Sequence, residues 1–169
     1  MSRFQGPFPL AKGHDVQAFE CGKAPLDEFL KKHALQNQGN GSALTFVGLD
    51  GERVVGYYSL ATSSVLPDDA PGRMTKGLAR HPVPVILMAR FAVDEAYQGQ
   101  GVGSGLFKDA AKRVLGVSKE GAGVRALVVQ AKDEEARAFY ERFDMIRYAD
   151  DSLHLYLLMK DVEQMVRNG

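Results

Sequence analysis

A glycine-rich turn is the part of this sequence best suited to chemistry. Gly99, Gly101, Gly103 and Gly105 stand at alternate positions, directly after an apolar run at residues 85–93. Because glycine has no Cβ, backbone N–H groups in such a turn can approach a bound anion closely. A helix follows at once, and its N-terminus adds unpaired N–H groups and the positive end of its dipole. The pattern predicts a site for a phosphate-bearing cofactor.

Three phosphate-binding patterns can be compared with this turn. A P-loop needs a lysine after its last glycine, but Gly103 is followed by Ser104. A dinucleotide-binding turn, G-x-G-x-x-G, would place its third glycine at Ser104 or at Leu106, depending on the register. The third pattern, Q/R-x-x-G-x-G/A, is matched by Gln98, Gly101 and Gly103, and here the chain resembles the GNAT N-acetyltransferases. The alternative is a turn that only allows tight packing of a strand on a helix.

A second segment resembles the same superfamily. Residues 124–131 form an apolar run typical of a strand, and Asp133 behind it can cap a helix. GNAT enzymes carry A-x-x-F/L-Y-E-x-x-G-F at this place, and Ala136, Tyr140 and Glu141 match it. The resemblance implies that Tyr140 is the general acid of acyl transfer, whereas the commoner role of a helical tyrosine is a half-buried aromatic.

The sequence departs from the family pattern at two places around that helix. Asp133 replaces the usual asparagine, and Asp144-Met145 replaces the usual Gly-Phe. Both departures concern the local backbone at the two ends of the helix.

Further similarity points to the toxin branch of GNAT, typified by TacT and AtaT. It lies at residues 19–30, 54–61 and 89–101, so the resemblance covers most of the chain. It implies an enzyme that acetylates the α-amine of aminoacyl-tRNA and blocks translation. It further implies a ribbon-helix-helix antitoxin as partner and, by analogy within the branch, a homodimer.

The resemblance also implies which residues hold acetyl-CoA. They form the end of the motif strand, whose backbone N–H groups would meet the reacting oxygen, and the turn with the start of its helix. They are Phe91, Ala92, Val93, Gln98, Gly99, Gln100, Gly101, Val102, Gly103 and Ser104.

The proton chemistry favours an α-amine as acceptor. A phenol of pKa about 10 is protonated at neutral pH and can give its proton to a leaving thiolate, whose thiol has a pKa of about 8.5. No carboxylate or histidine stands out as a base, and a lysine of pKa about 10.4 would need one. An α-amine near about 8 needs it far less, although a water chain can also serve as base. The alternatives are a GNAT enzyme acting on a small amine or a protein N-terminus, and a non-catalytic acyl-CoA-binding or operon-repressing partner of an antitoxin.

Charge gives tRNA binding no general support, because 21 basic residues balance 21 acidic ones. Basic side chains must therefore act locally, and the candidates for substrate binding are Arg90, Arg80 and Lys32. The alternative is that these residues only lie on a solvated surface, or that Arg90 forms a structural ion pair. The four histidines are scattered without the spacing of metal ligands, so no metal is expected.

The elements that must position these residues predict an α/β fold, the mixed α+β sheet of GNAT: splayed, mostly antiparallel and flanked by helices. Strands are expected near residues 8–12, 43–49, 53–63, 85–93, 124–131, 145–149 and 153–159. Helices are expected near 14–19, 25–39, 73–79, after the glycine turn, after Asp133 and at 162–167. With 169 residues, the prediction is a single acetyltransferase domain over 1–169. The single cysteine and the lack of a long apolar run favour a cytoplasmic protein without a membrane span.

Overall fold

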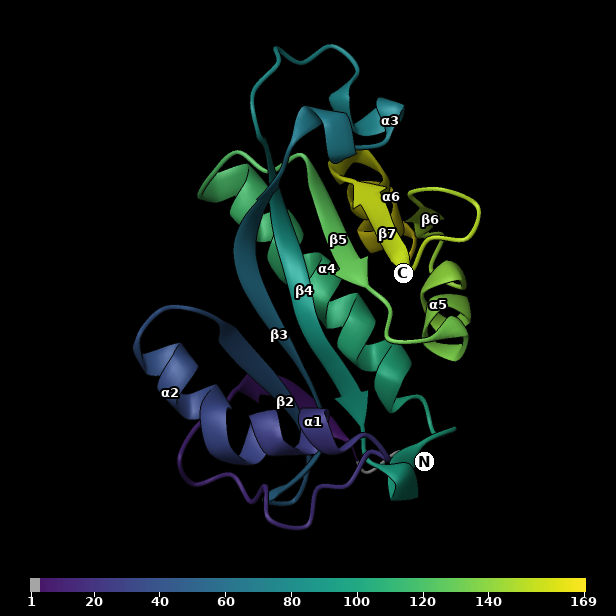
Figure 1. Ribbon diagram of the computed structural model, residues 1–169. Helices are drawn as coiled ribbons and strands as arrows, with labels where there is room; N and C mark the ends of the chain where they lie inside the picture. The colour runs from purple at the N-terminus through teal and green to yellow at the C-terminus, as the bar shows by residue number, and fades with distance from the viewer. Residues whose placement is uncertain (1–3) are drawn as a thin grey trace. The chain divides into compact units, whose positions relative to one another are not determined.

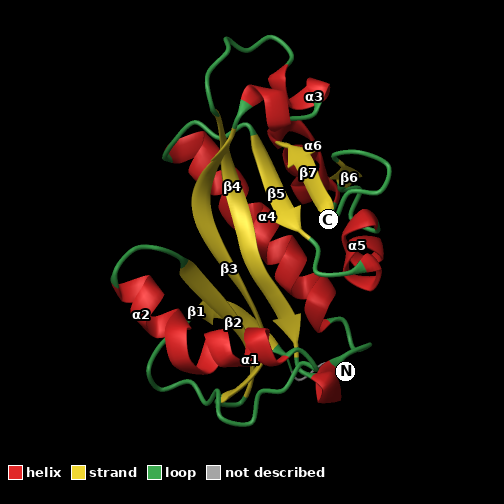
Figure 2. Cartoon of the chain, in the orientation of Figure 1, coloured by secondary structure: helices red, strands yellow, loops and turns green. Residues whose placement is uncertain are grey.

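The computed structural model describes residues 4–169, which form a mixed α/β fold (Figures 1 and 2). Its strands are β1 (Gln5–Pro9), β2 (Leu44–Asp50), β3 (Arg53–Val65), β4 (Val83–Val93), β5 (Ala126–Gln130), β6 (Ile146–Arg147) and β7 (His154–Leu158). Its α-helices are α1 (Ala24–Glu28), α2 (Ala34–Gly39), α3 (Gly72–Thr75), α4 (Val102–Glu120), α5 (Glu134–Glu141) and α6 (Met159–Asn168). A π-helical turn, η1 (Phe29–His33), joins α1 to α2, and two 3₁₀ turns are η2 (Pro67–Asp69) and η3 (Glu95–Tyr97). The strands follow the order β1-β2-β3-β4-β5-β7-β6.

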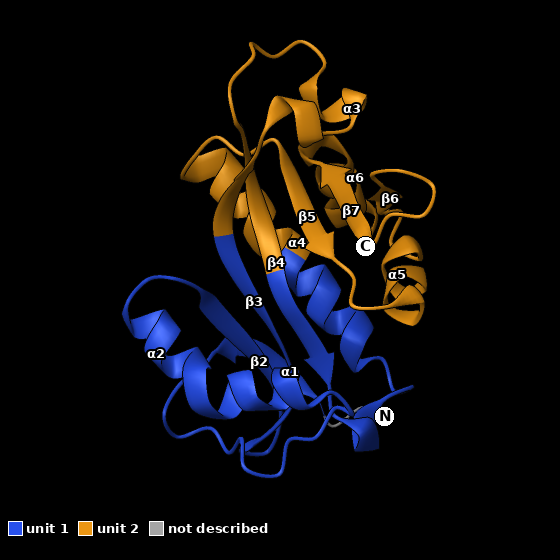
Figure 3. Cartoon of the chain, viewed as in Figure 1, with its two compact units in different colours: residues 1–61, 89–110 blue, residues 62–88, 111–169 orange. Residues whose placement is uncertain are grey.

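Within residues 4–169 the chain divides into two compact units (Figure 3). Unit 1 comprises residues 1–61 and 89–110, and unit 2 comprises residues 62–88 and 111–169. β3, β4 and α4 contribute residues to both. The prediction of one domain over 1–169 stays a prediction.

Unit 1 is built on an antiparallel meander of β1, β2 and β3, as the sequence predicts for the hairpin. Asp50 pairs with Arg53, so Gly51 opens a two-residue turn, and its φ of 63° is one that glycine adopts at little cost. Pro25 stands in the first turn of α1, where its missing N–H costs nothing. The helical stretch then runs through η1 to the end of α2 at Gly39, as expected.

The core of unit 1 lies between that helical stretch and the strands. Tyr57 is its centre, because its ring contacts the rings of Phe19 and Phe29 with centroids 5.6 and 6.2 Å apart. The Tyr57 hydroxyl donates to the carbonyl of Leu26 at 2.7 Å, and burial raises the pKa of this phenol far above its ordinary value. The core cluster comprises Leu10, Phe19, Phe29, Leu30, Ala34, Val47, Leu49, Val54, Tyr57 and Ala92.

Two predictions near the N-terminus need correction. The first strand lies at Gln5–Pro9 instead of residues 8–12, and the helix predicted at 14–19 is wrong. That segment forms turns, because Asp15 bridges to Arg53: its N–H donates to the carbonyl of Glu52 and its own carbonyl accepts from Val54, both at 2.8 Å. The backbone groups that a helix would use internally are thus bonded to the start of β3.

Unit 2 holds a parallel pair, β4 beside β5, formed by two strands whose existence the sequence predicts. Their pairing runs from Val85 with Ala126 to Met88 with Val129, whereas β4 continues to Val93. β7 then pairs antiparallel with β5 and with β6, which confirms the expected closing pair. The core cluster here comprises Met74, Val83, Val85, Ala126, Val128, Tyr156 and Leu158.

The helices of unit 2 confirm the predicted elements with shifted ends. α3 is the short helix expected near residues 73–79, and it buries Met74 completely. α6 begins at Met159, three residues before the predicted helix, because it follows β7 directly. In the part of the chain that the structure describes, no helix is both long and apolar enough to cross a membrane.

Candidate active site

The end of β4 delivers the chain to the glycine turn of unit 1. Ala92 is buried, while Phe91 and Val93 are half-buried. Gly56 of β3 makes room at this place, because a Cβ there would lie 2.9 Å from a methyl group of Leu106 and 3.0 Å from one of Val102. The start of α4 therefore packs directly against the β3 backbone, which fixes the position of the turn between β4 and α4.

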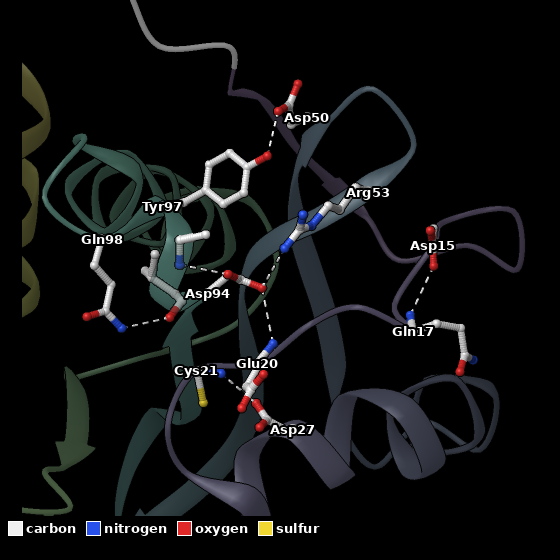
Figure 4. A network of polar contacts seen from close by, with 12 residues as sticks. Asp15, Gln17, Glu20, Cys21, Asp27, Asp50, Arg53, Asp94, Tyr97 and Gln98 are labelled. Carbon is white, nitrogen blue, oxygen red and sulfur yellow. Dashed lines mark hydrogen bonds and ion pairs between the residues drawn. The ribbon is translucent and has the colours of Figure 1, made fainter.

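A buried carboxylate organises the first residues after β4 (Figure 4). Asp94 is 2% exposed, and its Oδ1 accepts the N–H of Ala96 at 2.9 Å. Its Oδ2 accepts the N–H of Glu20 at 3.1 Å and Nη2 of Arg53 at 3.2 Å. The backbone N–H of Asp94 donates to Val55 at 2.9 Å. The side chain thus caps η3 and ties two distant parts of unit 1, at Glu20 and Arg53, to the start of the turn.

Three further contacts hold the middle of the turn, whose residues Figure 4 shows. The Tyr97 hydroxyl donates to Asp50 at 2.6 Å, a bond that raises the pKa of the phenol. Arg53 lies over the Tyr97 ring, with its Cζ 5.3 Å from the ring centroid. The Gln98 side-chain amide donates to the carbonyl of Val93 at 3.0 Å, so the first residue of the predicted motif fastens the turn back to the end of β4.

The glycines of the turn serve its backbone conformation. Gly99 and Gly101 have φ values of 78° and 86°, which L-residues with a side chain adopt only with strain. An added Cβ at either position would meet no atom within 4 Å, so crowding within the chain does not explain them. Gly105 donates to the carbonyl of Gly101 at 3.0 Å, which closes the first turn of α4.

This arrangement fits the diphosphate of an acyl-CoA. The first N–H groups of α4, which include those of Val102, Gly103 and Ser104, have no acceptor within the helix. They and the dipole of a helix that runs to Glu120 favour an anion here. In residues 4–169 there is no group of three or more His, Cys, Asp or Glu side chains that could hold a metal ion.

The three basic candidates for substrate binding differ in their contacts, and Arg90 and Lys32 belong to unit 1 whereas Arg80 belongs to unit 2. Arg90 stacks on Phe29 with its Cζ 4.0 Å from the ring centroid. This is a cation–π contact, whereas the structural alternative named for Arg90 was an ion pair. Lys32 is exposed on η1 and pairs with Glu28 at 3.7 Å. Arg80, which belongs to unit 2, is exposed and pairs with Asp68 at 2.7 Å. Exposed pairs of this kind contribute little to stability and leave the side chains available to a ligand.

Tyr140 belongs to unit 2, where it is the buried residue of α5. Its side chain is 6% exposed, and burial raises the pKa of the phenol well above its ordinary value. Asp133 caps the helix as predicted, because its carboxylate accepts the N–H of Ala136 at 2.8 Å. At the other end, Glu141 accepts from Nε and Nη2 of Arg147 at 3.0 and 3.1 Å.

The departure at Asp144 keeps the backbone that a glycine would adopt. Asp144 has a φ of 66°, and among the described residues it alone is a non-glycine with positive φ. Its N–H donates to the carbonyl of Glu141 at 3.0 Å, so the chain leaves α5 through a left-handed residue. The family's usual glycine at this place is explained by that conformation, and aspartate adopts it at a higher cost.

Sequence reasoning missed the polar network that supports the turn. Asp94 gave a usable signal, since an aspartate directly after an apolar strand often caps the next turn. Arg53 and Asp50 gave none, because they lie in the β2–β3 hairpin and meet Asp94 and Tyr97 only in the folded unit.

Comparison with known proteins places the chain in a family. Residues 13–145 match the acetyltransferase (GNAT) family model. The chain is 43% identical over 166 residues to a tRNA-acetylating toxin of Mycobacterium tuberculosis, which covers 98% of this chain and 99% of that one. It is 25% identical to AtaT complexed with acetyl-methionyl-tRNA, with a TM-score of 0.86 over 96% of this chain and 98% of that one.

A second structure of AtaT adds two more binding partners of that protein. It is a tyrosine-to-phenylalanine mutant of the toxin, bound to the C-terminus of the antitoxin AtaR and to acetyl-CoA. Its TM-score is 0.81 at 25% identity, over 97% of this chain and 98% of that one. With a family model that spans most of its length and a relative this similar along the whole chain, the protein belongs to the GNAT acetyltransferase family.

Proposed function

We propose that the protein is an acetyl-CoA-dependent N-acetyltransferase that acetylates the α-amine of aminoacyl-tRNA and thereby acts as a translation-blocking toxin. The observation that carries the proposal is the turn from Gln98 to Gly103, with Gly99 and Gly101 in the left-handed region at the N-terminus of α4. The 43% identity to a tRNA-acetylating toxin along nearly the whole chain supports the acceptor.

Acetyl-CoA supplies an acetyl group activated as a thioester. The residues proposed to hold it are the backbone of Phe91, Ala92 and Val93 along β4, and the turn with the start of α4. The latter comprises Gln98, Gly99, Gln100, Gly101, Val102, Gly103 and Ser104. The side chain of Gln98 acts indirectly, by fixing the turn to Val93, whereas the N–H groups of the turn and helix bind the diphosphate.

Tyr140 is proposed as the general acid. In the transfer, a bond forms between the amine nitrogen and the acetyl carbon, the carbon–sulfur bond breaks, and the leaving sulfur takes a proton from the phenol. The nitrogen releases one proton to water and the phenolate regains one, so that the products are a neutral amide and a thiol. The raised pKa of Tyr140 keeps that proton in place at neutral pH. The attacking α-amine has a pKa of about 8, so a good fraction of it is neutral without a dedicated base.

The partners proposed here are a ribbon-helix-helix antitoxin and a second copy of the chain as homodimer, in the cytoplasm. The AtaT structure with the antitoxin AtaR supports the first. Arg90, Arg80 and Lys32 remain proposed contacts to the tRNA, since each leaves at least part of its side chain accessible.

A cell-free translation assay tests the proposal. Wild-type protein with acetyl-CoA should stop synthesis, and a fresh supply of aminoacyl-tRNA after removal of the enzyme should restore it. Tyr140→Phe, which keeps the ring but removes the hydroxyl, should leave translation running while still binding acetyl-CoA. Inhibition that persists with Tyr140→Phe, or that needs no acetyl-CoA, would contradict the proposal.

A further inference from the structure

Four basic side chains from separate parts of unit 2 line one cavity. Its volume is about 330 Å³. The cations are Arg73 and Lys76 at α3, Arg125 just before β5, and Lys160 in the first turn of α6. Apolar residues complete the lining, namely Val124, Leu158 and Met159, and no acidic side chain is among the lining residues.

The walls of this basic cavity are fixed by hydrogen bonds through Arg125. Its Nε donates to the carbonyl of Met74 at 2.9 Å, and its Nη2 donates to the carbonyls of Lys76 and Arg73 at 3.1 and 3.3 Å. The carbonyl of Arg125 in turn accepts the N–H of Met159 at 3.0 Å. One residue therefore joins the end of α3 to the starts of β5 and α6, which Figure 1 shows side by side in unit 2.

The charge of the basic cavity is not a consequence of composition. The chain has 21 basic and 21 acidic residues, yet every charged residue in this lining is basic. Arg73 forms an ion pair with the carboxylate of Asp161 at 3.6 Å, and both side chains are partly exposed. Among the described residues neither Lys76 nor Lys160 has an ion-pair partner, and both are exposed. Two ammonium groups thus remain for an anion from outside the chain.

The position of the basic cavity within unit 2 favours a long ligand. It lies at the start of β5, whereas α5 with Tyr140 follows the end of that strand. A strand of this length spans about 17 Å. A ligand that is acetylated near Tyr140 and also reaches the basic cavity must therefore carry phosphates over a long distance, which a polynucleotide does and a free nucleotide does not.

We propose that the basic cavity binds a phosphate-bearing stretch of the tRNA backbone, with Lys76 and Lys160 as the principal contacts. The inference rests on the proposed function, because it names a second contact region for the same substrate. Arg125 serves to hold the walls, and the apolar lining offers a surface to a ribose or base next to the bound phosphates.

The test compares K76Q/K160Q, which removes both charges and keeps a polar side chain at each position, with wild type. K112Q is the matched control, since Lys112 is exposed on α4 in the same unit and does not line the cavity. Binding of uncharged tRNA is measured by fluorescence anisotropy between 50 and 200 mM salt. Each phosphate contact contributes a slope of about −0.9 in log affinity against log salt. Loss of two contacts should therefore reduce the slope by about 1.8. Between the two salt concentrations, the tRNA affinity of wild type should then fall about 12-fold more than that of K76Q/K160Q.

Two further readouts separate this inference from the proposed function. Acetyl-CoA affinity, and the kcat at saturating aminoacyl-tRNA, should be unchanged in K76Q/K160Q, since neither residue belongs to the proposed catalytic machinery. Equal tRNA affinity and salt slope in wild type, K76Q/K160Q and K112Q would overturn the basic cavity as a tRNA site, as would a loss confined to duplex DNA. A reduced slope together with no acetyl transfer by wild type would support the basic cavity and overturn the proposed function.

Discussion

Asp94 should be the residue of unit 1 on which the acyl-CoA turn depends most. Its two carboxylate oxygens accept three bonds, from the N–H groups of Ala96 and Glu20 and from Arg53. In Asp94→Asn only one of the two terminal atoms can still accept. Whichever way the amide is turned, at least one buried N–H then faces an NH₂ group.

The magnitude follows from those contacts. An orphaned buried N–H costs about 1–3 kcal/mol, and the bonds that remain lose their charge assistance. The ion pair with Arg53 contributes little to this loss, since the Arg53 side chain is 37% exposed and water screens the charge. A loss of about 3 kcal/mol in the free energy of unfolding is expected. For a chain of this size it lowers Tm by about 9 °C.

The same change should weaken acetyl-CoA binding. If about 1.4 kcal/mol of the loss falls on ordering the turn, the Kd for acetyl-CoA rises about tenfold. Asp50→Asn is the control, because Asp50 accepts one O–H from Tyr97 and an amide oxygen can still accept it, so that no donor is left without an acceptor. Calorimetry and thermal melting of both variants should show a large effect for the first and one below about 1 kcal/mol for the second. Equal Tm and Kd in the two variants would refute this account of Asp94.

Four other substitutions, at three positions, probe the turn and α5. Gly101→Ala should cost about 1–2 kcal/mol through its φ of 86° alone. Gly101→Asp adds a charge against the diphosphate, so its acetyl-CoA affinity in calorimetry should fall further, and an unchanged affinity would show that the cofactor lies elsewhere. Asp144→Gly should relieve left-handed strain and stabilise the protein by about 0.5 kcal/mol. That corresponds to a Tm higher by about 1–2 °C, and a lower Tm would mean that the aspartate side chain is needed. Glu141 has its pKa lowered by the bond to Arg147, so its contribution is complete above the ordinary glutamate pKa and is lost as the pH falls below about 4.3. The stability difference between wild type and Glu141→Gln should shrink over that fall in pH; a difference that stays constant in denaturant titrations would exclude the linkage.

The parts of the fold that sequence predicted are those whose cause is local. Asp133 caps α5 through a bond to a residue three positions on, and Gln98 with Gly101 and Gly103 forms a pattern within one turn. The strands β4 and β5 were predicted from two apolar runs, at residues 85–93 and 124–131, although their parallel pairing was not. In each case the determining contacts lie within a few residues or within one connection.

The parts that sequence did not predict depend on contacts between distant residues. The segment at 14–19 has helical spacing of Val16 and Phe19, but its backbone is bonded to the start of β3. Arg53 and Asp94 are 41 positions apart in the sequence, and neither has a local pattern that names the other. Arg125 reaches α3 across about as many residues, so Arg73 and Lys76 could be predicted as basic without the cavity they line.

Transfer of labelled acetyl from acetyl-CoA to a pool of aminoacyl-tRNA tests the central claim most directly. Wild type should place label on the α-amine, so that the label leaves the tRNA as an N-acetylated amino acid when the ester is hydrolysed. Tyr140→Phe should transfer far less while binding acetyl-CoA with unchanged affinity. Absence of label on the tRNA with wild type, while a small amine or a protein N-terminus is acetylated, would contradict the account.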